Sequence, residues 1–167
     1  SLDISGIQKF IYTIASKNAL RTLRARSFYL EIMMEHIIDT LLERLELSRA
    51  NLIYSGGGHC YLLLANTQKT REVLNTFQKE LQSWFLKYFR TALFVACGYS
   101  VCSGNTFRDV PEGSYANMFR QASASISKSK LHRYTAEEII ALNQYRADDY
   151  TRECKVCKRI GQVDEKG

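Results

Sequence analysis

The sequence lacks an apolar run long enough to cross a bilayer. Its longest runs, residues 60–65 and 92–97, are far shorter than the roughly 18 to 20 residues that a membrane-spanning helix needs. The N-terminus also lacks the charged, apolar and small-residue succession of a secretory signal. We therefore expect no membrane partner and a cytoplasmic location. Because the sequence opens on what looks like a strand end, we also expect it to be part of a larger protein.

Cysteine is too sparse for a disulfide-bonded scaffold. The five cysteines are an odd number, and Cys60, Cys97 and Cys102 lie in apolar, strand-like segments. We expect these three to be small buried side chains in a reducing compartment. Cys154 and Cys157 form a CxxC pair in the polar tail, which provides half of the ligands of a tetrahedral zinc site. Their partners are expected to lie outside this sequence.

A hydrophobic content of 46% in 167 residues is enough for one core and a short appendage. We expect residues 1–145 to form one domain and residues 146–167 to form a linker. The formal net charge of +6 favours a polyanionic partner such as RNA, DNA or a nucleotide phosphate. A merely solvated basic surface would carry the same charge.

The spacing of apolar residues predicts an α+β fold. In chain order, we expect a strand at residues 2–4, helices at 7–15 and 23–47, a hairpin of 51–54 and 59–65, a helix at 68–90, a buried strand at 92–101, and helices at 115–128 and 136–143. This order matches a ferredoxin-like palm (βααββαβ), with helices covering one face of an antiparallel sheet. Nucleotide cyclases, polymerase palms and RNA-recognition modules share that layout, so the fold alone does not assign a function.

A glycine-rich segment occupies the predicted hairpin tip: Ser55, Gly56, Gly57, Gly58 and His59. Without side chains, backbone N–H groups are open to a phosphate or a base, although glycines also form plain tight turns. Polymerase palms place a carboxylate at this tip, as part of a two-metal site. No acid is present here, so a complete two-metal site is not expected.

Asp3, at the end of the first strand, is either a lone metal ligand or a structural hydrogen-bond partner. Two basic clusters could grip phosphates or could simply be solvated. They contain Arg21, Arg24 and Arg26 before the longest helix, and Lys128, Lys130, His132 and Arg133 after the last long helix.

Aromatic side chains are expected in the core rather than in base stacking. Those that follow helical stripes are Phe28, Tyr29, Trp84, Phe85 and Phe89. The strands show few outward aromatics of the kind that RNA-recognition modules use to stack bases.

Three segments are distinctive in combination: DISGIQKFIYTI at residues 3–14, LRARSFYLE at 23–31 and SRANLIYSGGGH at 48–59. With the CxxC tail, they resemble the first palm domain of the large subunit of type III CRISPR effector complexes, Csm type. The resemblance implies a subunit with an HD nuclease domain, this palm, a zinc-binding linker, a second palm with a GGDD hairpin, and a helical C-terminal domain.

The resemblance also implies synthesis of cyclic oligoadenylates from ATP when target RNA binds, in antiviral defence. This palm would be the noncatalytic ATP-binding half, with Mg or Mn held by the second palm. Ser27 and residues 55–58 would line the nucleotide pocket, and Lys128 and Lys130 would reach phosphates. Partners would be the second palm, other effector subunits, and guide and target RNA. The fragment alone is expected to be inactive, and single-stranded DNA cleavage would need the HD domain.

Two alternatives remain open at this stage. A GGDEF-type nucleotide cyclase shares the fold, but the acid-free hairpin argues against it. An RNA-binding or subunit-docking scaffold would use the basic surface, and salt-sensitive RNA binding by the isolated domain would favour it.

Overall fold

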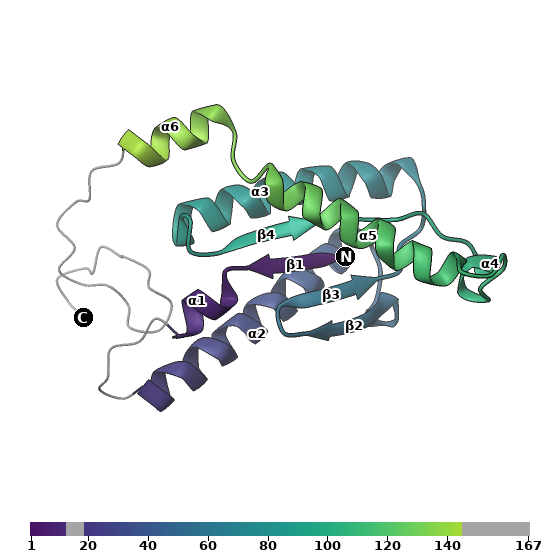
Figure 1. Ribbon diagram of the computed structural model, residues 1–167, viewed down its shortest axis with the longest axis horizontal. Helices are drawn as coiled ribbons and strands as arrows, with labels where there is room; N and C mark the ends of the chain where they lie inside the picture. The colour runs from purple at the N-terminus through teal and green to yellow at the C-terminus, as the bar shows by residue number, and fades with distance from the viewer. Residues whose placement is uncertain (13–18, 145–167) are drawn as a thin grey trace.

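The computed structural model describes residues 1–12 and 19–144, and its centre is an antiparallel sheet of four strands in the order β2-β3-β1-β4 (Figure 1). The strands are β1 (Leu2–Ser5), β2 (Leu52–Gly56), β3 (His59–Leu62) and β4 (Phe94–Cys97). The central strand β1 is antiparallel to both β3 and β4. This sheet confirms the predicted ferredoxin-like α+β class.

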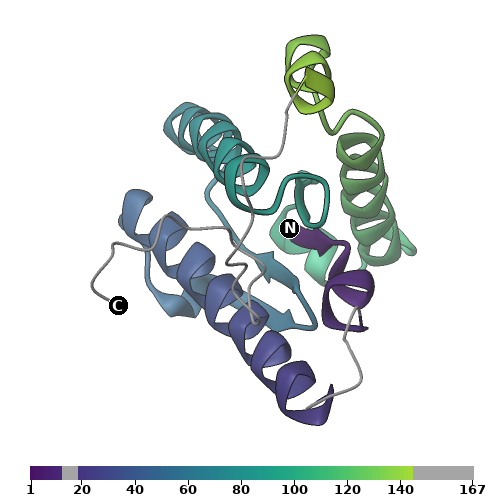
Figure 2. The ribbon, with the colours of Figure 1, turned by 90° about the vertical axis from the view of Figure 1, so that its left-hand side faces the viewer.

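Two long helices cover one face of the sheet. They are α2 (Ala19–Arg44) and α3 (Gln68–Phe89), which lie side by side on the same side of the strands (Figure 2). Alternate residues of β1, Leu2 and Ile4, are buried in the same core cluster as the apolar stripes of both helices. Asp3 and Ser5 consequently lie on the opposite face.

Helix α5 (Ser114–Leu131) covers part of that opposite face, so the expectation of helices on one face only was incomplete (Figure 2). Its Ile126 packs with Phe94 and Ala96 of β4. The physical reason is that β4 is buried on both faces, which an uncovered sheet does not allow. At Gly98 the helix is so close that an added Cβ would lie 2.7 Å from the Ile126 backbone nitrogen.

The other elements are short: α1 (Ile7–Tyr12), the 3₁₀ turn η1 (Arg49–Asn51), α4 (Gly104–Phe107) and α6 (Ala136–Gln144). The predicted strand at residues 92–101 was too long, because pairing ends at Cys97, opposite the first residue of β1. Tyr99 and Val101 are exposed beyond it. None of the helices within residues 1–12 and 19–144 is long and apolar enough to span a membrane.

Arg26 does not belong to a surface cluster. Its side chain is only 2% exposed, and its Nη1 donates to the carbonyl of Phe10 at 2.6 Å, with the guanidinium 5.5 Å from the centre of the Phe10 ring. It therefore attaches α1 to α2, and neither the phosphate-gripping nor the solvated interpretation describes it. Phe28 was also mispredicted, since it is exposed; it lies two residues before Leu30 and hence on the far side of α2 from the buried stripe.

Candidate functional site

The glycine hairpin forms a two-residue turn seated on the start of α1. Gly57 and Gly58 have φ of +60° and +82°, which suits a turn of the hairpin type, while Gly56 still belongs to β2. The Gly58 carbonyl accepts from the Ile4 N–H at 2.8 Å, and a Cβ on Gly58 would lie 2.1 Å from Ile7 Cδ1. A Cβ on Gly57 would meet nothing within 4 Å. The tip is therefore anchored at Gly58 and open at Gly57.

Beside this turn, Asp3 joins the sheet to α5. It pairs in register with His59, whose Nδ1 lies 3.1 Å from Asp3 Oδ1. The Lys130 Nζ lies 2.6 Å from Oδ2, and the Ser5 hydroxyl donates to the same oxygen at 3.4 Å. Of the two predicted roles for Asp3, the structure shows the polar-partner role, through groups from β1, β3 and α5.

The charge state of Asp3 follows from these neighbours. Burial alone would raise its pKa, but hydrogen bonds and charge from Lys130 and His59 outweigh burial, so the pKa lies below its ordinary value. Asp3 is thus a carboxylate whose two oxygens are both engaged. Across residues 1–12 and 19–144, no group of three or more His, Cys, Asp or Glu side chains is placed to hold a metal ion.

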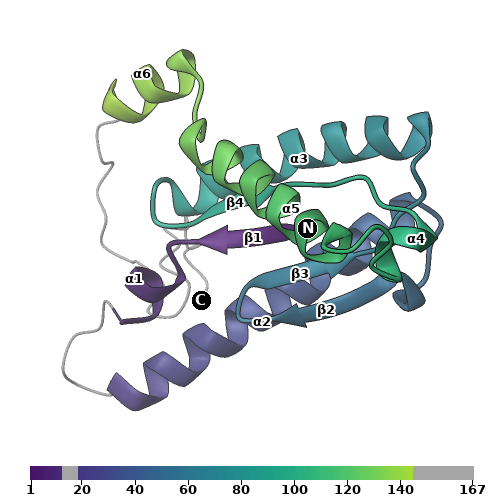
Figure 3. The same ribbon diagram turned by 45° about the vertical axis from the view of Figure 1, so that its right-hand side comes forward.

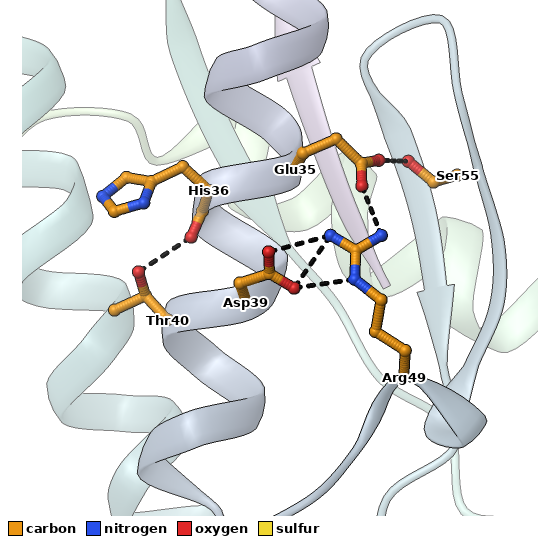
Figure 4. A network of polar contacts seen from close by, with 6 residues as sticks. All are labelled: Glu35, His36, Asp39, Thr40, Arg49 and Ser55. Atoms are coloured by element: carbon orange, nitrogen blue, oxygen red, sulfur yellow. Dashed lines mark hydrogen bonds and ion pairs between the residues drawn. The ribbon is translucent and has the colours of Figure 1, made fainter.

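Ser55 faces the other side of the sheet, toward α2 (Figure 4). Its hydroxyl donates to Glu35 Oε1 at 3.1 Å, and Glu35 also accepts from Arg49 Nη1 at 2.5 Å. Arg49 donates to both oxygens of Asp39, and hydrogen bonds to Asp39 and then Glu35 raise the pKa of its guanidinium. This network fixes β2 and η1 on α2. Sequence reasoning missed it, although two acids four residues apart on a predicted helix share one face.

Ser27 and Lys128 are the remaining predicted site residues. Ser27 is half-buried in α2. Lys128 lines a cavity of about 560 Å³ between α3 and α5, which we name the α3–α5 groove. Ser1 and Leu2 also line it, so it opens at the start of β1 rather than beside the tip, which lies at the other end of that strand. Lys128 and Lys130 therefore do not share one site.

Aromatic side chains also line the outer face of the hairpin, which the sequence analysis did not expect. Tyr61 lies with its ring centre 4.7 Å from that of His59 and 5.2 Å from that of Phe119 on α5. Tyr54, on the edge strand, is 52% exposed. Helix α5 thus shields Tyr61 from solvent and leaves Tyr54 open.

The family follows from a comparison with known proteins. Residues 1–145 match the family model described as Csm1 subunit domain B. The chain belongs to this family. The resemblance to the palm of a Csm-type large subunit is thereby confirmed.

Relatives of this Csm1 domain B include a protein of Enterococcus italicus (strain DSM 15952 / CCUG 50447 / LMG 22039 / TP 1.5), 48% identical over 159 residues, and one of Mycobacterium tuberculosis (strain ATCC 25618 / H37Rv), 44% identical over 175 residues. Both are described as the CRISPR system single-strand-specific deoxyribonuclease Cas10/Csm1 (subtype III-A). The matches cover 95% and 98% of this chain but 21% and 22% of those proteins. The chain thus spans about a fifth of the length of these relatives.

Solved structures agree with the fold. A Csm1-Csm4 cassette in complex with pppApApA superposes with a TM-score of 0.74 at 31% identity, covering 86% of this chain and 20% of that one. The cassette with one ATP gives 0.73 at 32% identity, with the same shares. The cassette with cA3 gives 0.70 at 32% identity, covering 78% and 18%.

Proposed function

We propose that this Csm1 domain B is the noncatalytic ATP-binding palm of a type III CRISPR large subunit that makes cyclic oligoadenylates from ATP when target RNA binds. Its partners are the second palm of the same subunit, other effector subunits, and guide and target RNA. Cys154 and Cys157, which lie outside the described residues, are proposed as half of a zinc site in the linker that follows.

The observation that carries this proposal is that, among the residues that the structure describes, no free carboxylate lies at the hairpin tip. The tip presents Gly57 and Gly58, and the nearby Asp3 already contacts Lys130 and His59 through its two oxygens. A catalytic metal pair needs carboxylates that are open to the ion. The two glycines and the engaged Asp3 do not fit a catalytic metal pair, so we assign the Mg or Mn of the reaction to the second palm.

The relatives support the nucleotide class. Csm1-Csm4 cassettes have been solved with ATP, AMPPNP, pppApA, cA3 and cA4. Linear and cyclic adenylates are what an enzyme that joins ATP molecules would bind as intermediates and products. The cassettes with ATP and with AMPPNP each superpose over 86% of the present chain. This overlap favours the same ligand class for this palm.

Within this proposal, the tip contributes backbone rather than side chains. The open space at Gly57 lets a phosphate or a base approach the main chain. Ser55 takes part through its backbone, because its hydroxyl is bound to Glu35. Ser27 is the proposed adenine contact, and Lys130 would reach a phosphate only by leaving Asp3.

The test replaces Gly57 by leucine in the full-length subunit and measures ATP binding and cyclic product. The added side chain enters the open space where the nucleotide is proposed to lie. The matched control is Gly113→Leu at the start of α5, at the opposite end of the sheet from the tip (Figure 1). Both glycines have positive φ and free space, so both variants carry the same backbone cost of about 1–2 kcal/mol.

We expect Gly57→Leu to lose the ATP held by this palm and to stop product formation, while Gly113→Leu keeps both. If Gly57→Leu binds and cyclises ATP like the control, the glycines are only a turn and the proposal fails. The RNA-recognition alternative finds less support, because Phe119 covers the outward Tyr61. The GGDEF-type alternative lacks the tip carboxylate that it requires.

A further inference from the structure

The α3–α5 groove combines cations with the absence of a lining acid among the described residues. Several cations outside it are paired with carboxylates: Arg44 with Glu80, Lys69 with Glu46, and Arg49 with Glu35 and Asp39. In the groove, no described lining residue is Asp or Glu, while the cations Arg71 and Lys128 line it. Within the part of the chain that the structure describes, the groove therefore carries positive charge without a lining carboxylate.

The two long cations of the groove have no acidic partner among the described residues. The Arg71 guanidinium donates to the neutral amide oxygen of Asn66, at 2.7 Å from Nη2 and 3.3 Å from Nε. Lys128 forms no ion pair within residues 1–12 and 19–144. Lys130, two residues further along the same helix, is paired with Asp3. Neither side chain is paired with a carboxylate of the described residues, so both can meet an anion from outside.

The interior of the groove is apolar. Leu2, Leu41 and Phe77 form its floor and belong to the buried core, and Leu62 and Leu74 line its sides. The segment that leaves β4, with exposed Tyr99 and Val101, runs between α3 and α5 and forms one lip (Figure 3). A volume of about 560 Å³ lies within the range of about 300–1,000 Å³ in which ligand groups are buried.

We propose that the α3–α5 groove docks an acidic segment of a partner subunit, with one large apolar side chain seated on the leucine floor. An apolar centre with a polar, charged rim is the usual anatomy of a protein interface. Side-chain amides along the groove can form hydrogen bonds with the peptide backbone of that segment. They belong to Asn66, just before α3, and to Asn75, Gln78 and Gln82 on α3.

A peptide fits these features better than a nucleic acid does. Single-stranded RNA is held by a track of cations with aromatic rings on which bases stack. The groove offers two separated long cations, and its one exposed aromatic ring is Tyr99 among the described lining residues. A partner subunit is a reasonable source, because solved relatives are two-component Csm1-Csm4 cassettes.

The test is site-specific photocrosslinking in the native effector complex. A benzoylphenylalanine replaces Gln78, a half-buried residue of the groove wall, and mass spectrometry identifies the crosslinked peptide. We expect an acid-rich segment of another subunit. Crosslinking to RNA, to the same chain or to a segment without acids would overturn the proposal, and so would the absence of any crosslink.

Charge reversal provides the specificity control. Lys128→Glu and Arg71→Glu should each lower the crosslink yield about tenfold, because they oppose an acidic ligand at the rim. Arg120→Glu on α5 and Lys79→Glu on α3 change the same charge at exposed positions outside the groove and should leave the yield unchanged. Equal effects of all four variants would refute a specific site. This outcome is independent of ATP binding at the tip, which the Gly57 variant measures separately.

Discussion

Replacing Gly98 by alanine should push α5 away from the sheet. Gly98 follows β4 and has no positive φ, so alanine meets no backbone strain there. Its Cβ would lie 2.7 Å from the Ile126 nitrogen and 2.9 Å from the Ala122 carbonyl oxygen, both backbone atoms of α5. Neither atom can move unless the helix moves.

The expected magnitude is a balance of two terms. Overpacking costs about 1–3 kcal/mol, and the loss of glycine's freedom in the unfolded chain returns about 0.4–1 kcal/mol. The free energy of unfolding should therefore fall by about 0–2.6 kcal/mol, which places Gly98→Ala about 1–3 kcal/mol below an alanine variant that has no clash. Gly104→Ala is the matched control, since Gly104 also lacks positive φ and a Cβ there meets nothing within 4 Å. It should be neutral or stabilising by up to about 1 kcal/mol.

Urea unfolding followed by circular dichroism measures both variants. The double variant Gly98→Ala/Ile126→Ala separates a backbone clash from a side-chain clash, because it removes only the Ile126 side chain, whose Cγ1 would lie 2.7 Å from the new Cβ. We expect no rescue relative to Ile126→Ala. Full rescue, or a Gly98→Ala protein as stable as Gly104→Ala, would refute the close seating of α5 on β4.

Three further predictions concern buried polar groups and thiols. Arg26→Met should lower the free energy of unfolding by about 2–4 kcal/mol, because it strips the Phe10 carbonyl of a buried donor; a change within about 0.5 kcal/mol would contradict this. Asp3 has a lowered pKa when folded, so its stabilisation is present above the unfolded value of 3.8 and is lost as pH falls. The stability gap between wild type and Asp3→Asn should therefore close in acid, and a pH-independent gap would be the opposing result. Burial raises the pKa of Cys97 to about 12, so iodoacetamide should modify Cys102 first in peptide mapping, and the reverse order would argue against burial.

The elements with uninterrupted local patterns were predictable from the sequence. The stripe of α2 runs from Leu30 to Leu42 without glycine or proline, and its helix was placed to within a few residues at either end. The length of β4 was not predictable, because it depends on β1, which has four residues to pair with. An apolar run shows where a strand can form, but its partner determines where pairing stops.

The composition of the site was partly visible in the sequence, whereas its geometry was not. The acid-free hairpin follows directly from residues 55–59. The contact between Asp3 and His59 depends on the register of β1 with β3, which is set by the Gly57–Gly58 turn and by the anchoring of Gly58 on Ile4 and Ile7. Residues 56 apart in sequence become neighbours only through that pairing.

Lys128 and Lys130 illustrate a constraint that the sequence already contained. Two residues apart on a helix of 3.6 residues per turn, their side chains leave on nearly opposite sides. One phosphate therefore cannot be gripped by both while α5 stays intact. The structure assigns Lys130 to Asp3 and Lys128 to the α3–α5 groove. Because one helix carries both, any displacement of α5, including that expected for Gly98→Ala, should disturb the Asp3 contact beside the hairpin and the groove together.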